Sequence, residues 1–171
     1  LEQRSLPSVT ALFVPGTGEL NIQIDTDESI QVQSFGGNVL VPAAEPGQPL
    51  LPVEGLGSIT SACIRSLVVT GGDEANTIDL SAVTTVNFPL LTLIQVDADN
   101  GNDTIIGSPD LADSLDGGDG KDQMLGGAGD DTVYGDGGND WIDGGNGNDF
   151  LYGGAGDDLI QDSSGDDIIH G

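Results

Sequence analysis

GGDGKDQML at residues 117–125 is the first of six consecutive nine-residue units, followed by GGAGDDTVY, GDGGNDWID, GGNGNDFLY, GGAGDDLIQ and DSSGDDIIH, which ends at residue 170. In all six units position 4 is Gly and position 6 is Asp. Position 8 is always apolar and is occupied by Met124, Val133, Ile142, Leu151, Ile160 and Ile169. A fixed period with one apolar residue per unit predicts a solenoid, because one unit cannot bury its apolar side chain alone.

The spacing within the unit predicts its shape and its chemistry. Glycines at positions 1, 2 and 4 allow a sharp turn, and positions 7 to 9 form a short strand with position 8 inward. Two units then make one coil, and stacked coils bring position 6 of one unit to about 4.8 Å from position 6 two units later. Carboxylates this close repel each other unless a cation lies between them. With turn carbonyls, and without His or Cys, they form an oxygen site that suits Ca²⁺ better than Mg²⁺.

These units resemble the glycine-rich nonapeptide GGxGxDxUx of the RTX (repeats-in-toxin) family. The resemblance is strong over residues 97–171, where ADNGNDTII from Ala98 and a degenerate unit at 107–116 precede the six regular units. It is faint at residues 71–79 and absent before them. The resemblance implies a right-handed parallel β-roll. Helix signals are nearly absent because this density of Gly and Asp cannot sustain a helix, so we expect an all-β chain.

The resemblance also implies a ligand set for each ion. In this family one turn provides the carbonyls of positions 2 and 4 and the Asp of position 6, and the turn eighteen residues later provides the carbonyls of positions 1 and 3 and its Asp. Carried over here, the pairs are Gly118, Gly120 and Asp122 with Gly135, Gly137 and Asp140; Asp136, Gly138 and Asp140 with Gly153, Ala155 and Asp158; Gly127, Gly129 and Asp131 with Gly144, Asn146 and Asp149; and Gly145, Gly147 and Asp149 with Asp162, Ser164 and Asp167.

Two further sites extend this series. A fifth pairs Asp103 with Asp122, and a sixth would pair Asp113 with Asp131, although residues 107–110 lack the turn glycines. Gly154, Gly156, Asp158 and Asp167 would form half of additional sites. The expected cofactor is therefore calcium, at about four to six ions.

The net charge of −26 limits the partners of the chain. Residues 1–96 contain ten Asp or Glu and residues 97–171 contain nineteen, all Asp. A polyanion repels nucleic acid and anionic membranes, and no run of 18 apolar residues predicts membrane insertion. Bound Ca²⁺ would relieve the repulsion, so we expect the repeats to fold only with the metal and to unfold on chelation.

The remainder of the chain predicts two less regular regions. Alternating runs at residues 9–14, 20–25, 29–35 and 38–41 predict an N-terminal β meander, followed by a proline-rich linker, which together span residues 1–58. Residues 59–96 predict irregular β coils leading into the roll at 97–171. Among them, Leu67, Val68 and Val69 are the expected core, and 91–96 is expected to be a continuous apolar strand.

Catalytic residues are scarce. His170 is the only histidine and lies at an outward position, so neither a zinc motif nor a Ser-His-Asp triad is expected, and we expect no enzyme. The lone Cys63 is expected to be a small buried hydrophobe. The outward positions 7 and 9 carry Tyr134, Trp141, Phe150, Tyr152, Leu159 and Ile168, which are either ordinary exposed residues of a repeat or a protein-contact stripe.

Three functions remain open at this point. The chain starts at Leu, as in a processed precursor, and Gly171 is the first residue of a ninth unit. An open last coil favours a bacterial protein, secreted or at the cell surface, that has a structural or surface-assembly role and self-associates head to tail into an extracellular filament or coat. The alternative is a calcium-folded module of a larger adhesin, or the type I secretion tail of a secreted enzyme. An enzyme in its own right ranks below both.

Overall fold

The computed structural model describes residues 9–14, 16–24, 29–35, 38–41, 51–52 and 61–171. Within this part of the chain nearly all regular structure is strand, and the single helical turn is η1 (Ser61–Cys63). No helix among the described residues is long and apolar enough to cross a membrane. Residues 1–8 and most of the expected linker lie outside the described residues.

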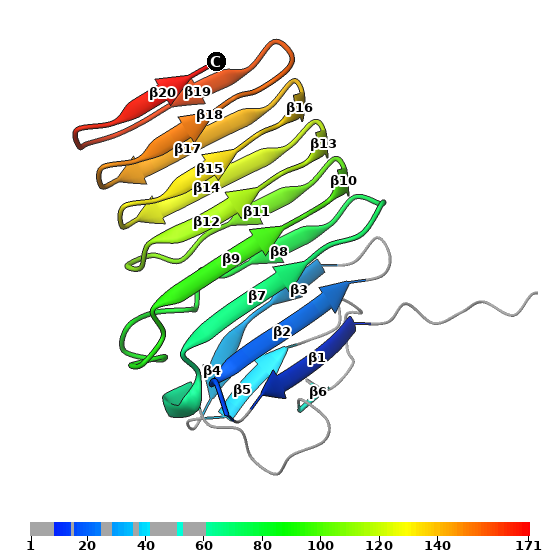
Figure 1. Cartoon of the computed structure of the whole chain (residues 1–171), viewed down its shortest axis with the longest axis vertical. Helices are drawn as coiled ribbons and strands as arrows, with labels where there is room; N and C mark the ends of the chain where they lie inside the picture. Colours follow the sequence, from blue (N-terminus) through cyan, green and yellow to red (C-terminus); the bar gives the residue numbers. More distant parts are fainter. Residues whose placement is uncertain (1–8, 15, 25–28, 36–37, 42–50, 53–60) are drawn as a thin grey trace, which may run out of the picture.

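Two long sheets form the walls of a parallel β-roll (Figure 1). The eight-stranded sheet contains, in spatial order, β1 (Val9–Val14), β2 (Glu19–Ile24), β7 (Ser66–Thr70), β9 (Leu93–Asp97), β12 (Asp113–Asp116), β15 (Thr132–Tyr134), β18 (Phe150–Tyr152) and β20 (Ile168–His170). The six-stranded sheet contains β19 (Leu159–Gln161), β17 (Trp141–Asn146), β14 (Gln123–Ala128), β11 (Thr104–Ile106), β8 (Thr77–Asp79) and β3 (Ser29–Gln31).

Short strands in the turns add a narrow third sheet along one edge of the roll (Figure 1). It contains β10 (Asn100–Gly101), β13 (Asp119–Gly120) and β16 (Gly137–Gly138), which pair in parallel. Beside the first coils, β4 (Gln33–Phe35), β5 (Asn38–Val41) and β6 (Leu51–Pro52) form a separate antiparallel sheet.

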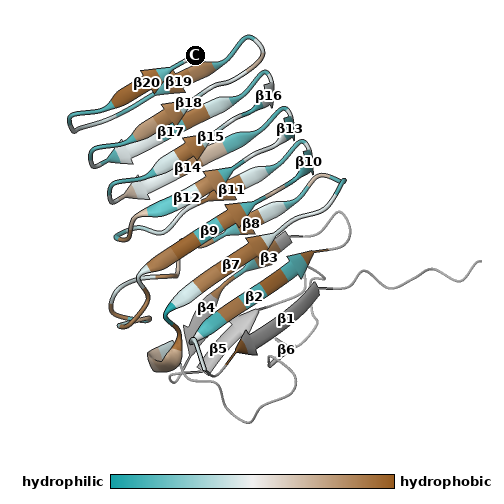
Figure 2. Cartoon of the chain, in the orientation of Figure 1, coloured by the Kyte–Doolittle hydropathy of each residue, from teal (hydrophilic) through white to brown (hydrophobic). Residues whose placement is uncertain are grey.

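The register confirms the predicted coil of two repeat units. Met124 pairs with Ile142, and Ile142 with Ile160, in one sheet, while the other sheet aligns position 8 of the alternate units. The position-8 side chains of the inner coils are fully buried, and Figure 2 shows the hydrophobic residues concentrated in the strands, between hydrophilic turns. One apolar residue per unit is therefore enough to fill the narrow interior, as the solenoid prediction requires.

The faint repeat at residues 71–79 and the degenerate unit at 107–116 both take their places in this register. Ile78 pairs with Ile105 on one side and with Ile30 on the other. Leu115 pairs with Val96 and Val133. The parallel roll therefore extends well before the regular repeats, because an apolar residue at position 8 preserves the column even where the turn sequence has diverged.

The N-terminal strands join the same two sheets. β1 pairs antiparallel with β2, but β2 pairs in parallel with β7 and β3 pairs in parallel with β8. Strands on both sides of the expected boundaries at 58/59 and 96/97 thus belong to the same sheets. An alternating apolar pattern identifies these strands but does not reveal whether their partners run parallel or antiparallel.

Two residue-level predictions about residues 59–96 are wrong, and a third is right only in part. Val68 is not core: it lies outward and half-buried between the buried Leu67 and Val69, because side chains alternate along a strand. The strand expected at 91–96 is present but starts later, because β9 begins at Leu93, which is 49 % exposed, and it buries alternate residues. Cys63 is exposed at the η1 turn rather than buried.

Candidate metal centre

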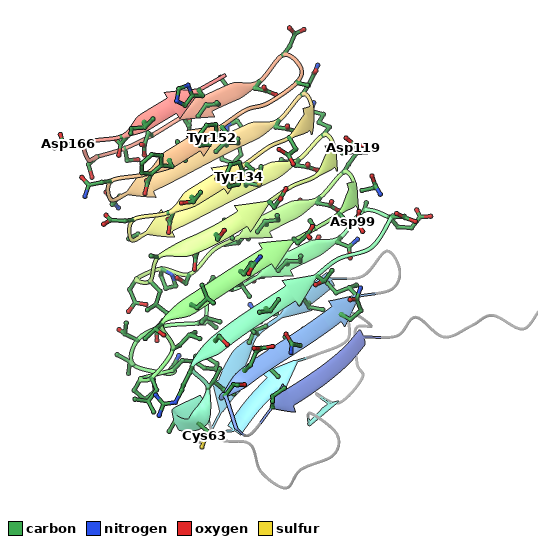
Figure 3. The ribbon with its side chains drawn as sticks, viewed as in Figure 1. Cys63, Asp99, Asp119, Tyr134, Tyr152 and Asp166 are labelled. Carbon is green, nitrogen blue, oxygen red and sulfur yellow. The ribbon has the colours of Figure 1, made fainter. Side chains whose placement is uncertain are left out.

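The position-6 aspartates form two columns, one along each turn edge of the roll. One column is Asp103, Asp122, Asp140 and Asp158, and the other is Asp113, Asp131, Asp149 and Asp167. Within each column the backbone N–H of one Asp donates to Oδ1 of the Asp in the next coil, at 2.8 to 3.0 Å. In Figure 3, Asp99 and Asp119 mark one turn edge and Asp166 marks the opposite edge.

The second carboxylate oxygen of most of these aspartates is buried without a hydrogen-bond partner. The unpartnered atoms are Oδ2 of Asp103, Asp122, Asp131, Asp140, Asp149 and Asp158. A buried charged oxygen without a partner is strongly destabilising. A cation that bound these atoms would remove that cost, so the described aspartates fit a chain of metal sites.

Position 1 of the repeat is Gly because the free oxygen lies against it. A Cβ at Gly126 would lie 2.5 Å from Gly144 O and 2.6 Å from Asp131 Oδ2, and one at Gly135 would lie equally close to Gly153 O and Asp140 Oδ2. A carbonyl from the next coil and a free carboxylate oxygen therefore face the same small volume. This combination of hard oxygen donors is the one that Ca²⁺ prefers.

Burial raises the pKa of these carboxyls in the metal-free chain. The pKa rises from 3.8 to about 7 for Asp122 and Asp131, chiefly through burial and secondarily through neighbouring carboxylates in the same column, while the bond from a backbone N–H opposes the rise. Burial raises the pKa of Asp140 and Asp149 in the same direction. Burial thus disfavours the ionised form of these groups, and a positive charge nearby would favour it.

The structure brings together the aspartate pairs of the first five expected sites. Each pair is linked by the N–H to Oδ1 bond described above. Position 2 of the turns has positive φ up to Gly154, including the non-glycines Asp99 at 69° and Asp136 at 62°, but not at Ser163 in the last turn. Asp136 thus adopts the backbone of the glycine it replaces, which Asp tolerates better than most residues. Ligation by the individual carbonyls remains a prediction.

The expected sixth site differs from the others. Ser108 donates from its backbone N–H to Asp113 Oδ2, at 2.5 Å. Its hydroxyl lies within donor distance of both Leu111 O, at 3.1 Å, and Asp113 Oδ1, at 3.2 Å. Both Asp113 oxygens therefore have donors within the chain itself. Because Ser108 in the turn at 107–110 places its donors against the Asp113 carboxylate, a cation between Asp113 and Asp131 is disfavoured.

The repeat pattern alone did not predict a role for two carboxylates: that of Asp162, which was expected to contribute only its carbonyl, and that of Asp116. Asp162 brings a side chain to position 1, and its carboxylate lies near those of Asp149 and Asp167. Asp116 has a buried unpartnered Oδ1, and burial together with the charges of Asp136 and Asp97 raises its pKa to about 6. The sequence contains a signal for both. Asp162 stands at position 1, which is Gly in the other regular units, and Asp116 stands at the outward position 9.

Stacked coils, two aspartate columns and buried unpartnered oxygens define the class of this protein as a parallel β-roll with cation sites between its turns. Residues 97–133, 116–151 and 143–171 match the RTX calcium-binding nonapeptide repeat (4 copies). Residues 97–171 therefore carry RTX calcium-binding repeats, as the sequence predicted. No curated protein and no solved structure matches the chain significantly.

Proposed function

We propose that this protein is a secreted structural or surface protein whose calcium-loaded roll associates end to end with further copies. The exposure of the last coil carries this proposal. Ile169 is 48 % exposed, whereas Leu151, at the same position one coil earlier, is fully buried. β19 and β20 are also the outermost strands of their sheets. Open strand edges beside an exposed core position form a template for another coil.

Calcium supports a structural role because every expected site lies between two coils. The aspartates that would bind the ions also hydrogen-bond those coils together, through their Oδ1 atoms. Cation binding at such a site stabilises the folded state directly, since the unfolded chain has no preformed site. The ions would thus take the place of a thick apolar core rather than transmit a signal.

The opposite end of the roll offers the complementary surface. β1 is the outermost strand of the eight-stranded sheet and β3 is the outermost strand of the six-stranded sheet. Pairing of one copy's last coil with another copy's first strands is a heterologous contact, which produces a filament unless the rotation closes a ring. The ring of Tyr152 stacks between those of Tyr134 and His170, with centroids 5.1 and 5.0 Å apart. This stack ends at the last coil, which the next copy would cover.

Secretion and the lack of catalysis are part of the same proposal. Calcium sites of extracellular modules have dissociation constants of about 10⁻⁴ to 10⁻³ M, so a roll that depends on weak sites would fold outside the cell. The only histidine is His170, and its ring stacks on Tyr152. Turnover of a polysaccharide or peptide substrate by the purified chain would contradict the non-catalytic part.

End-to-end association is tested with the full chain at millimolar calcium, by light scattering and negative-stain electron microscopy. We expect filaments or oligomers for the wild type and discrete monomers for Ile169→Lys. The matched control is Leu93→Lys, because Leu93 is 49 % exposed but lies on an inner strand of the same sheet. Leu93→Lys should assemble like the wild type.

Monomeric wild type at saturating calcium would contradict assembly and favour the alternative. In that case the last coil would be covered by further coils of a longer polypeptide, as in a module of an adhesin or a secretion tail. Assembly that Ile169→Lys does not affect would instead place the contact elsewhere on the surface.

A further inference from the structure

Asp162 stands at position 1 of its unit, where the five preceding units have Gly. Beside Gly126 and Gly135 in the earlier coils, the free Asp oxygen faces a backbone carbonyl of the next coil. Beside Gly144, the two nearest oxygens are Asp149 Oδ2, at 2.8 Å from the point where a Cβ would lie, and Asp162 Oδ1, at 2.9 Å. Beside Gly144 a carboxylate oxygen therefore lies where a neutral carbonyl lies beside Gly126 and Gly135.

The resulting cluster contains three carboxylates. Ligand atoms of Asp149, Asp162 and Asp167 all lie within 4.8 Å of one another. Asp149 is 0 % exposed, and its Oδ2, directed into this cluster, is buried without a partner, as is Oδ2 of Asp162. Asp162 Oδ1 accepts hydrogen bonds from the N–H groups of Ser163, at 2.8 Å, and Gly145, at 3.1 Å. These bonds fix the side chain, while its Oδ2 stays without a partner.

We propose that Asp149, Asp162 and Asp167 form a cation site of a different class from the two-carboxylate sites of the roll. It binds Ca²⁺ more tightly than they do and is the first to fill. It also favours a trivalent cation of similar size, such as a lanthanide ion, over Ca²⁺ more strongly than they do. The inference deepens the calcium-dependent role proposed above at one of its sites.

Ligand charge explains both properties. The affinity of an oxygen site for Ca²⁺ rises with the number of charged ligands and with the rigidity of the site. Coulomb attraction scales with the product of the charges, so a third carboxylate strengthens the binding of a +3 ion by more than that of a +2 ion. A neutral carbonyl at the same place provides neither effect to this extent.

The test compares Asp162→Asn with Asp166→Asn in the full chain. Both variants lose one negative charge, but Asp166 is exposed at position 5, outside the cluster. In Asp162→Asn the side-chain amide keeps an oxygen for the N–H groups of Ser163 and Gly145, so the turn is preserved. Ca²⁺ binding is measured by isothermal titration calorimetry, and Tb³⁺ is then added to calcium-loaded protein while terbium luminescence is recorded.

We expect Asp162→Asn to weaken the tightest class of Ca²⁺ sites by at least about tenfold, and to weaken Tb³⁺ binding by a larger factor. Asp166→Asn should leave both unchanged. Equal weakening for both cations would mean that Asp162 acts only through the turn and would overturn the proposal, as would an unchanged tightest class. Because these readouts concern cation binding, they hold whether or not the chain assembles end to end.

Discussion

Replacing Asp131 by Asn should change the stability of the roll in opposite directions with and without calcium. Asp131 is fully buried, its Oδ1 accepts the backbone N–H of Asp113 at 2.8 Å, and its Oδ2 has no partner. Asn keeps the oxygen that joins the coils and replaces the charged oxygen with a neutral amide nitrogen. The substitution therefore separates the electrostatic role of the residue from its structural role.

The magnitude follows from the pKa of Asp131 in the metal-free chain. Burial raises this pKa from 3.8 to about 7, and one pKa unit corresponds to about 1.4 kcal/mol. After allowance for screening by water at the turn, ionisation at pH 8 costs roughly 2–4 kcal/mol. The unpartnered amide nitrogen of Asn costs about 1 kcal/mol, which leaves a net gain of roughly 1–3 kcal/mol. With calcium bound, loss of the anionic ligand costs roughly 3 kcal/mol.

The pH dependence has a defined sign. Because the folded-state pKa lies above the unfolded value, the protonated Asp131 favours folding below about pH 4, and this contribution is lost as the pH rises through about 7. Metal-free wild type should therefore gain β structure as the pH falls from 8 to 5, by circular dichroism in EDTA. Asp131→Asn should reach the same signal at a higher pH.

The calcium-bound protein is tested by thermal unfolding at pH 7.5 with excess Ca²⁺, and Asp131→Asn should lower its Tm by about 10 °C. Asp143→Asn is the matched control, because Asp143 lies on the outer face of β17 and accepts a hydrogen bond from Gln161 at 2.7 Å. It should change neither measurement appreciably. Destabilisation by Asp131→Asn in EDTA as well as in calcium would refute the reasoning.

Two further outcomes follow from the packing. In EDTA, amide hydrogen exchange should become fast in β15 and β17 while β7 and β9 stay protected, because Val69 and Val96 lie in an apolar core that needs no ion. Uniform loss of protection across all four strands would contradict this expectation. Gly126→Ala should destabilise the calcium-bound roll by roughly 1–3 kcal/mol, since its Cβ would lie 2.5 Å from Gly144 O, whereas Gly16→Ala, with nothing within 4 Å, should have little effect in urea unfolding.

The repeat region could be predicted closely because its physics is local and periodic. Position 8 had to point inward and position 6 had to recur along an edge, and the register of Met124 with Ile142 and the bond from Asp122 N–H to Asp140 confirm both. The faint unit at 71–79 was recognisable for the same reason. Wherever the nine-residue period is kept, the sequence predicts both where a strand lies and which strands pair with it.

Outside the period, the sequence does not specify which strands pair. β2 and β3 read as parts of a local meander, yet each adds to a sheet in parallel with a strand more than forty residues away. The same limit applies to side chains that depart from the consensus. Ser108 reads as a missing turn glycine, and only the three-dimensional turn shows that it places two donors against Asp113.

The turns of the roll show three ways of filling the same space between coils. In the early coils a long connection places Val83 and Phe88 in the core, and Thr85 binds Asp110 of the turn at 107–113. In that turn, Ser108 satisfies the aspartate directly. From the next coil onward the connection shortens to the bare glycine turn, which has no side chain to fill the gap.

A shortened turn leaves the Asp oxygens unpartnered, and a cation bound there would satisfy them. We therefore expect calcium dependence to be confined to the coils whose turns are too short to satisfy their own carboxylates. The early coils, with their apolar connections, would need no ion to form their end of the roll.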